Sequence, residues 1–120
     1  MTEPTAIPAL KDPSLLKDAC LVDDAWVQAA SGETIAVTNP ADGSVVGPVP
    51  SLSGAEVEAL IARAAVAQKG WAALPAKDRS ARLRRWFELM LANVDDLGLI
   101  MTLEQGKPLA EAKGEVVYSA

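Results

Sequence analysis

The spacing of apolar residues changes character near residue 53. Before it, two short segments rich in β-branched and aromatic residues, 20–28 and 34–49, are each interrupted by turn-forming residues. The turns fall at residues 23–25 and 39–43, and such an arrangement is typical of β-hairpins. The sequence therefore predicts two hairpins. The type of the first turn stays open, because residues 23–25 read Asp-Asp-Ala and lack the Asn-Gly pair that signals a tight hairpin turn.

After residue 53, apolar residues recur at the spacing of one helix face. Ser53 and Glu56 match a capping box, Asn93 and Pro75 mark boundaries, and Gly106 with Pro108 marks a sharp corner between two helices. The sequence thus predicts four helices. Their apolar stripes are Val57, Ile61, Ala64 and Trp71, then Leu83, Phe87, Met90 and Val94, then Leu97, Ile100 and Met101. In the fourth helix Leu109, Ala112 and Val116 are expected to face inward.

Residues 1–13 contain three prolines and little periodicity, so they are predicted to be a tail that is disordered or lies on a surface. Residues 14–120 are predicted to be the structured part. Asp96 is expected to stabilise the N-terminus of the third helix, where a negative charge is favourable.

Composition excludes several classes of protein. Half of the 120 residues are apolar and the net charge is −5, which is ordinary for a globular protein and disfavours nucleic acid as a partner. No apolar run reaches the length of a membrane span, and the N-terminus resembles neither a secretory signal nor a transit peptide. One cysteine and no histidine exclude a zinc site of the Cys/His type. A cytoplasmic setting is expected.

Cys20 is the only thiol and the first candidate for chemistry. A nucleophilic cysteine needs a base or a cationic environment, and this chain has no histidine to provide one. We therefore interpret Cys20 as a buried structural residue. No glycine-rich phosphate-binding loop occurs in the sequence either.

Charged residues near the second helix and the corner could also form a site. A basic cluster on the second helix could bind an anion, but a solvated face paired with nearby acids is the simpler interpretation. Two acids beside the corner have no acid–base partner and suit helix ends. The basic residues are Lys77, Arg79, Arg82, Arg84 and Arg85, their expected partners are Glu88, Asp95 or Asp96, and the corner acids are Glu104 and Glu111.

The corner carries the most specific string in the chain. Residues 102–112 read Thr-Leu-Glu-Gln-Gly-Lys-Pro-Leu-Ala-Glu-Ala, and residues 38–43 read Thr-Asn-Pro-Ala-Asp-Gly. The first string resembles a helix corner of the aldehyde dehydrogenase superfamily, closest to its succinate-semialdehyde dehydrogenase branch. The second resembles the early hairpin of the same family. The resemblance extends from about residue 15 to residue 120.

This resemblance implies a longer α/β enzyme with the aldehyde dehydrogenase fold, of which this chain is a mainly α-helical N-terminal fragment with two N-terminal β-hairpins. Residues 14–120 would be the incomplete N-terminal part of the cofactor-binding domain. The parent enzyme would use NAD or NADP to oxidise succinate semialdehyde to succinate, as a homo-oligomer. Its cysteine nucleophile, its glutamate base and its cofactor-binding residues would lie outside this chain, so the chain alone is expected to bind no cofactor and to be inactive.

The resemblance also implies one site within the chain. Several members of the family hold a structural monovalent cation, and the matching positions are the backbone carbonyls of Val37 and Thr38 with the carboxylate of Glu104. The relatives carry Asp where this chain has Glu104, and the longer side chain changes the geometry. The alternative is that Glu104 is simply a helix-terminal acid.

A second class of function stays open: a free-standing helical interaction module without enzymatic activity. The last predicted helix has no stop signal before residue 120, which favours the fragment. In that case the isolated chain would not fold autonomously, because later sequence would cover its apolar stripes. The coding sequence beyond residue 120 distinguishes the two.

Overall fold

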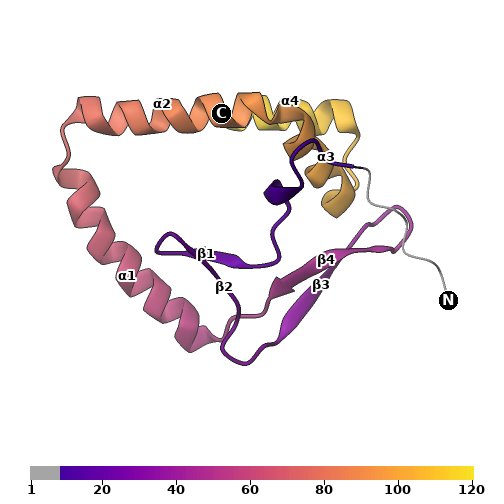
Figure 1. Ribbon diagram of the computed structural model, residues 1–120, viewed down its shortest axis with the longest axis horizontal. Coiled ribbons are helices and arrows are strands. Elements are labelled where there is room, and N and C mark those ends of the chain that lie inside the picture. The colour runs from indigo at the N-terminus through magenta and orange to yellow at the C-terminus, as the bar shows by residue number, and fades with distance from the viewer. Residues whose placement is uncertain (1–8) are drawn as a thin grey trace.

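The computed structural model describes residues 9–120, and residues 1–8 of the predicted tail lie outside the described part. A 3-10 turn, η1 (Pro13–Leu15), precedes four strands and four helices (Figure 1). The prediction of two hairpins followed by mainly α-helix is confirmed. The strands are β1 (Cys20–Val22), β2 (Ala25–Val27), β3 (Thr34–Thr38) and β4 (Val45–Pro50), and the helices are α1 (Gly54–Ala73), α2 (Ala76–Ala92), α3 (Val94–Gln105) and α4 (Leu109–Ser119).

The first hairpin pairs β1 with β2 in an antiparallel ladder. Its two central turn residues, Asp23 and Asp24, both have positive φ, at 47° and 64°. A type I′ turn requires positive φ at both positions, and Asp adopts it more readily than most residues. The pair Asp-Asp therefore takes the place of Asn-Gly, which settles the turn that the sequence left open.

The second hairpin pairs β3 with β4, with an irregularity in the register between Val37 and Thr38. Its turn is closed by the backbone of Asn39, whose N–H donates to Ser44 O at 2.8 Å and whose carbonyl accepts from Gly43 N at 2.8 Å. The Asn39 side chain also accepts from Ala41 N at 3.0 Å. The Asn-Pro turn is therefore a self-contained, hydrogen-bonded unit.

The predicted capping box at the start of α1 is present. Ser53 Oγ accepts from Glu56 N, and Glu56 Oε2 accepts from Ser53 N at 2.7 Å. The other carboxylate oxygen, Oε1, accepts from Ala30 N at 2.8 Å. These bonds lower the pKa of Glu56, with the Ala30 N–H as the largest cause. Glu56 thus joins α1 to the loop between the two hairpins, a role that the sequence did not predict.

The best-packed part is the pair α3 and α4. Gly106 ends α3 with φ at 77°, and its N–H donates to Thr102 O at 2.8 Å, as a left-handed helix cap requires. Leu103, Ala112 and Val116 are buried between the elements. Leu109, predicted to face inward, is 41% exposed, so that prediction is wrong for this chain.

The helices α1 and α2 carry no buried residue. Figure 1 shows them as two long arms that meet at a corner. Large apolar side chains on them are uncovered, with Ile61 64%, Val66 70% and Trp86 63% exposed. The Cα radius of gyration is 17.1 Å, against about 14 Å for a compact domain of this length. Within residues 9–120, no helix has the length and apolar character needed to cross a membrane.

Candidate functional site at the helix corner

The helix corner packs against the turn of the second hairpin. A Cβ added at Gly106 would lie 2.8 Å from Pro40 Cγ, which is closer than side chains approach. Two features therefore favour glycine at residue 106: its positive φ and the close contact with Pro40. Residues 38–43 and 102–112, the two most distinctive strings of the sequence, therefore contact each other through Pro40 and Gly106.

A pocket of about 300 Å³ lies beside Glu104, two residues before Gly106 in the chain. Three parts of the chain form its walls: the segment before β1, the strands β3 and β4, and Glu104 near the end of α3. The lining residues are Leu16, Lys17, Asp18, Val37, Val46, Gly47, Pro48, Val49 and Glu104.

Two of the three residues predicted to bind a cation line this pocket. They are Val37 and Glu104, whereas Thr38 is not among the lining residues. The irregularity of the ladder falls between Val37 and Thr38, where a bulge disturbs the regular pairing of strand carbonyls. Among the described residues, 9–120, no group of three or more Cys, Asp or Glu side chains is placed to hold a metal ion. The cation site stays a prediction.

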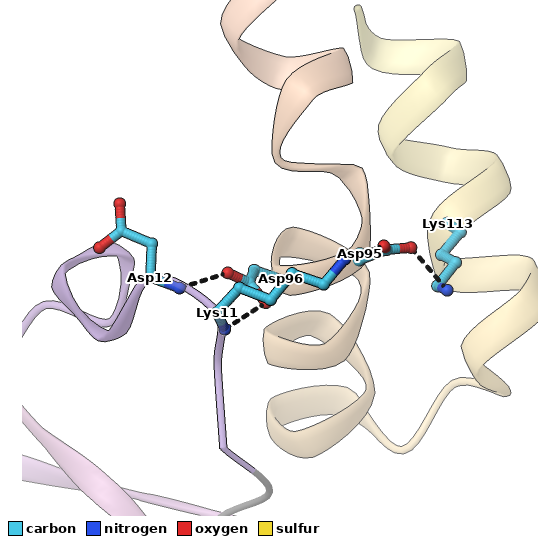
Figure 2. Close-up of polar contacts among 5 residues, drawn as sticks. All are labelled: Lys11, Asp12, Asp95, Asp96 and Lys113. Atoms are coloured by element: carbon cyan, nitrogen blue, oxygen red, sulfur yellow. Dashed lines mark hydrogen bonds and ion pairs between the residues drawn. The ribbon is translucent and has the colours of Figure 1, made fainter.

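Two adjacent carboxylates at the start of α3 form the most connected polar cluster (Figure 2). Asp96 is 5% exposed and accepts two backbone hydrogen bonds, from Lys11 N at 3.0 Å and from Asp12 N at 2.8 Å. Asp95 binds two ammonium groups, that of Lys11 at 2.6 Å and that of Lys113 at 2.8 Å. The cluster joins the N-terminal segment, α3 and α4.

The ion pair between Asp95 and Lys11 shifts the pKa of both groups. The Lys11 ammonium, which donates to Asp95, and then that of Lys113 lower the pKa of Asp95 to about 2. The same hydrogen bond to Asp95 raises the pKa of Lys11. Asp95 and Lys11 are therefore both charged at neutral pH.

Sequence reasoning found Asp96 only as a charge at a helix N-terminus and missed its partners. It also expected Asp95 or Asp96 to pair with the basic cluster of α2, and this is wrong because both carboxylates face the N-terminal segment. The expectation for Glu88 is confirmed. Its carboxylate lies 3.4 Å from Arg84 Nε and 4.0 Å from an Arg85 guanidinium nitrogen.

Cys20 opens β1 and is half-buried rather than fully buried. It is not among the residues that line the pocket beside Glu104. The arrangement around the corner thus supplies a pocket lined by two acidic residues, Asp18 and Glu104, and by Lys17, and it does not bring the thiol of Cys20 into that pocket.

Comparison with known proteins agrees with this arrangement. Residues 26–120 match the aldehyde dehydrogenase family. A glutarate-semialdehyde dehydrogenase of Pseudomonas aeruginosa is 53% identical over 92% of this chain, and an NADP(+) succinate-semialdehyde dehydrogenase of Escherichia coli is 50% identical over the same share. The solved structure of an aldehyde dehydrogenase from Brucella melitensis biovar abortus superposes with a TM-score of 0.90, at 62% identity over 93% of this chain.

The chain belongs to the aldehyde dehydrogenase family. It spans 23% of the length of each of these three relatives. The fold, with two small antiparallel strand pairs and a majority of helix, is that of the N-terminal part of such enzymes.

Proposed function

We propose that this chain is the N-terminal segment of an NAD- or NADP-dependent dehydrogenase that oxidises succinate semialdehyde to succinate. The observation that carries the proposal is the identity of about half of the residues with two semialdehyde dehydrogenases over nearly the whole chain. Both of those enzymes are named for a short aldehyde that carries a carboxylate. Succinate semialdehyde is the substrate of one and glutarate semialdehyde that of the other, so glutarate semialdehyde is the second candidate.

The proposed enzyme is a cytoplasmic homo-oligomer, and oxidation of succinate semialdehyde gives it a place in the degradation of GABA. Residues 14–120 form the first part of its cofactor-binding domain, and its nucleophile, its base and its cofactor contacts lie in sequence beyond this chain. Neither a nucleic acid nor a membrane is among the proposed partners.

The test is steady-state kinetics of the full-length gene product. We expect kcat/KM to be highest for succinate or glutarate semialdehyde, and at least about tenfold lower for butanal, which has a similar length but no carboxylate. Each aldehyde is assayed with NAD and with NADP. Equal kcat/KM for butanal and for both semialdehydes would reject the proposed substrate class.

A matched variant tests the assignment of the thiol. Cys20→Ala in the full-length enzyme should leave kcat nearly unchanged, because Cys20 lies in a hairpin strand and outside the pocket beside Glu104. A loss of orders of magnitude in kcat, with unchanged thermal stability, would show that Cys20 is the nucleophile.

The proposal includes a structural monovalent cation held by the carbonyls of Val37 and Thr38 and by Glu104. Its support is that Val37 and Glu104 line one pocket. We expect Na⁺ or K⁺ to raise the thermal unfolding midpoint of the full-length enzyme relative to tetramethylammonium at equal ionic strength. Glu104→Gln should abolish the difference and Glu104→Asp should retain it. A midpoint of the wild type that is independent of the cation would reject the site.

The alternative is a free-standing helical interaction module that uses its uncovered apolar faces. The coding sequence distinguishes it directly. A reading frame that continues for several hundred codons beyond residue 120 supports the enzyme, and a stop codon there supports the module.

A further inference from the structure

The segment before β1 crosses the start of α3 with little to hold it. We call residues 9–18 the strap. None of its residues is buried, and its only regular structure is the three-residue turn η1. Three of its leucines are half-buried, Leu10, Leu15 and Leu16, so apolar burial contributes to its attachment without burying any strap residue fully. Its position depends on these leucines and on a few polar contacts.

The strongest of these contacts is the one to Asp96. The two oxygens of this carboxylate each accept one backbone N–H of the strap, from Lys11 and from Asp12. Among the described residues, Asp96 is the one buried charged side chain. A buried carboxylate that loses its donors is strongly unfavourable, so the strap and Asp96 stabilise each other.

A second, weaker contact lies beside the first. Asp95 binds the Lys11 ammonium of the strap and the Lys113 ammonium of α4 (Figure 2). The Lys11 side chain is 76% exposed and that of Asp95 48% exposed, so solvent and salt screen this ion pair. The two contacts thus differ in their sensitivity to salt.

The far end of the strap is fixed to the first hairpin. Gln28 Nε2 donates to Asp18 O at 2.9 Å, and the Lys17 ammonium lies 4.8 Å from the centre of the Trp26 ring. The strap contributes three residues to the wall of the pocket beside Glu104: Leu16, which lies between the two attachments, and Lys17 and Asp18, which lie at the hairpin attachment itself. Release of the α3 attachment would therefore free the wall at Leu16, whereas Lys17 and Asp18 would stay held by the hairpin.

We propose that the strap is a gate over the pocket beside Glu104, latched by Asp96 and tuned by the ion pair of Asp95. Release of the Asp96 latch opens the pocket at Leu16, while Lys17 and Asp18 stay attached to the first hairpin and α3 and α4 remain folded. The proposal concerns residues of this chain alone and holds whether or not the pocket binds a cation.

Hydrogen–deuterium exchange of the full-length protein tests the latch. Asp96→Ala should speed exchange of the strap amides about tenfold or more, while peptides of α3 and α4 stay within about twofold of the wild type. Asp95→Asn should give only about a twofold increase, and 1 M NaCl should reproduce it in the wild type. Asp78→Ala is the matched control, because Asp78 is also an acid in the first turn of a helix but is exposed and remote from the strap contacts.

A change on the strap side gives a second test that leaves α3 untouched. Lys11→Pro removes the N–H that Asp96 accepts, whereas Lys11→Ala removes only the ammonium group. The proline variant keeps the Asp12 N–H bond, so we expect its strap exchange to lie between those of Asp96→Ala and Lys11→Ala, and we expect the alanine variant to match Asp95→Asn. If Asp96→Ala does not fold, this pair decides alone. If the strap amides exchange as slowly in Lys11→Pro as in Lys11→Ala, the proposed latch is rejected.

Labelling of a thiol inside the pocket tests the gate. Val46 lines the pocket and is 7% exposed, so Val46→Cys places a thiol there at similar volume. Its alkylation by iodoacetamide, followed on its own peptide by mass spectrometry, should be at least about fivefold faster with Lys11→Pro than with Lys11→Ala. Equal rates despite an opened strap would reject the gate. Faster exchange throughout α3 in both latch variants would also reject it, because Asp96 would then only stabilise the helix.

Discussion

At the scale of single residues, Gly106 is the position where backbone and packing impose the same requirement. Gly106→Ala should destabilise the protein by about 1–3 kcal/mol through its positive φ alone, with a further loss from the contact with Pro40. Gly43→Ala is the matched control, since Gly43 has φ at 73° but nothing within 4 Å of an added Cβ. Urea unfolding of both variants in the full-length protein separates the two effects. Equal losses of unfolding free energy in the two variants would show that the Pro40 ring moves aside at no energetic cost.

Asp95 gives a second prediction at this scale, in its dependence on pH. Its pKa of about 2 lies below the ordinary value of 3.8, so its ion pairs stabilise the folded state above pH 4 and lose that effect as pH falls toward 2. The difference in unfolding free energy between the wild type and Asp95→Asn should be constant from pH 7 to about pH 5. It should shrink below pH 4. A difference that grows on acidification would contradict this.

The chemistry of Asp96 explains why the sequence could not predict the latch. Its partners are backbone N–H groups 85 and 84 residues away. Every residue except proline carries such a donor, so no side-chain pattern marks them. The capping box of Ser53 and Glu56 was predictable because both partners are side chains at a fixed local spacing, whereas the bond of Glu56 to Ala30 N was not.

At the scale of elements, α3 and α4 pack closely at one glycine and loosely at another. A Cβ at Gly98 would lie 2.7 Å from Lys113 Cγ and 3.3 Å from Lys113 N, while one at Gly114 meets nothing within 4 Å. Gly98→Ala should therefore destabilise the pair by about 1 kcal/mol, because overpacking outweighs the gain in helix propensity. Gly114→Ala should stabilise it by up to about 1 kcal/mol. Hydrogen exchange of the α4 amides measures both, and the same sign for the two variants would contradict the prediction.

The apolar spacing predicted the four helices and their apolar faces, but not which faces are covered. Ala112 and Val116 face inward as expected because α3 lies against them, whereas Leu109, on the same stripe, is 41% exposed. Periodicity reports the face that a helix buries in its finished protein. It does not report whether the covering element belongs to the same 120 residues.

At the scale of the whole molecule, the uncovered faces of α1 and α2 predict that the isolated 120-residue chain does not fold autonomously. Burying one large apolar side chain contributes roughly 1.5–3 kcal/mol, and several such side chains on these helices are more than half exposed. We expect the isolated chain to bind hydrophobic dye and to lose near-UV circular dichroism before far-UV signal during urea unfolding. A dye-free monomer with one sharp transition in both signals would instead support the independent module.

The contact between Gly106 and Pro40 also has a consequence for how this sequence can diverge. A larger residue at position 106 is admissible only after position 40 has become smaller, so the two positions should co-vary among related sequences. Pro40→Ala combined with Gly106→Ala should recover the steric part of the loss and leave the strain of the positive φ, giving a favourable coupling energy in a double-mutant cycle. The substitutions tolerated at residue 40 in the hairpin turn therefore depend on the residue at position 106 in the helix corner, although 66 positions separate the two residues along the chain.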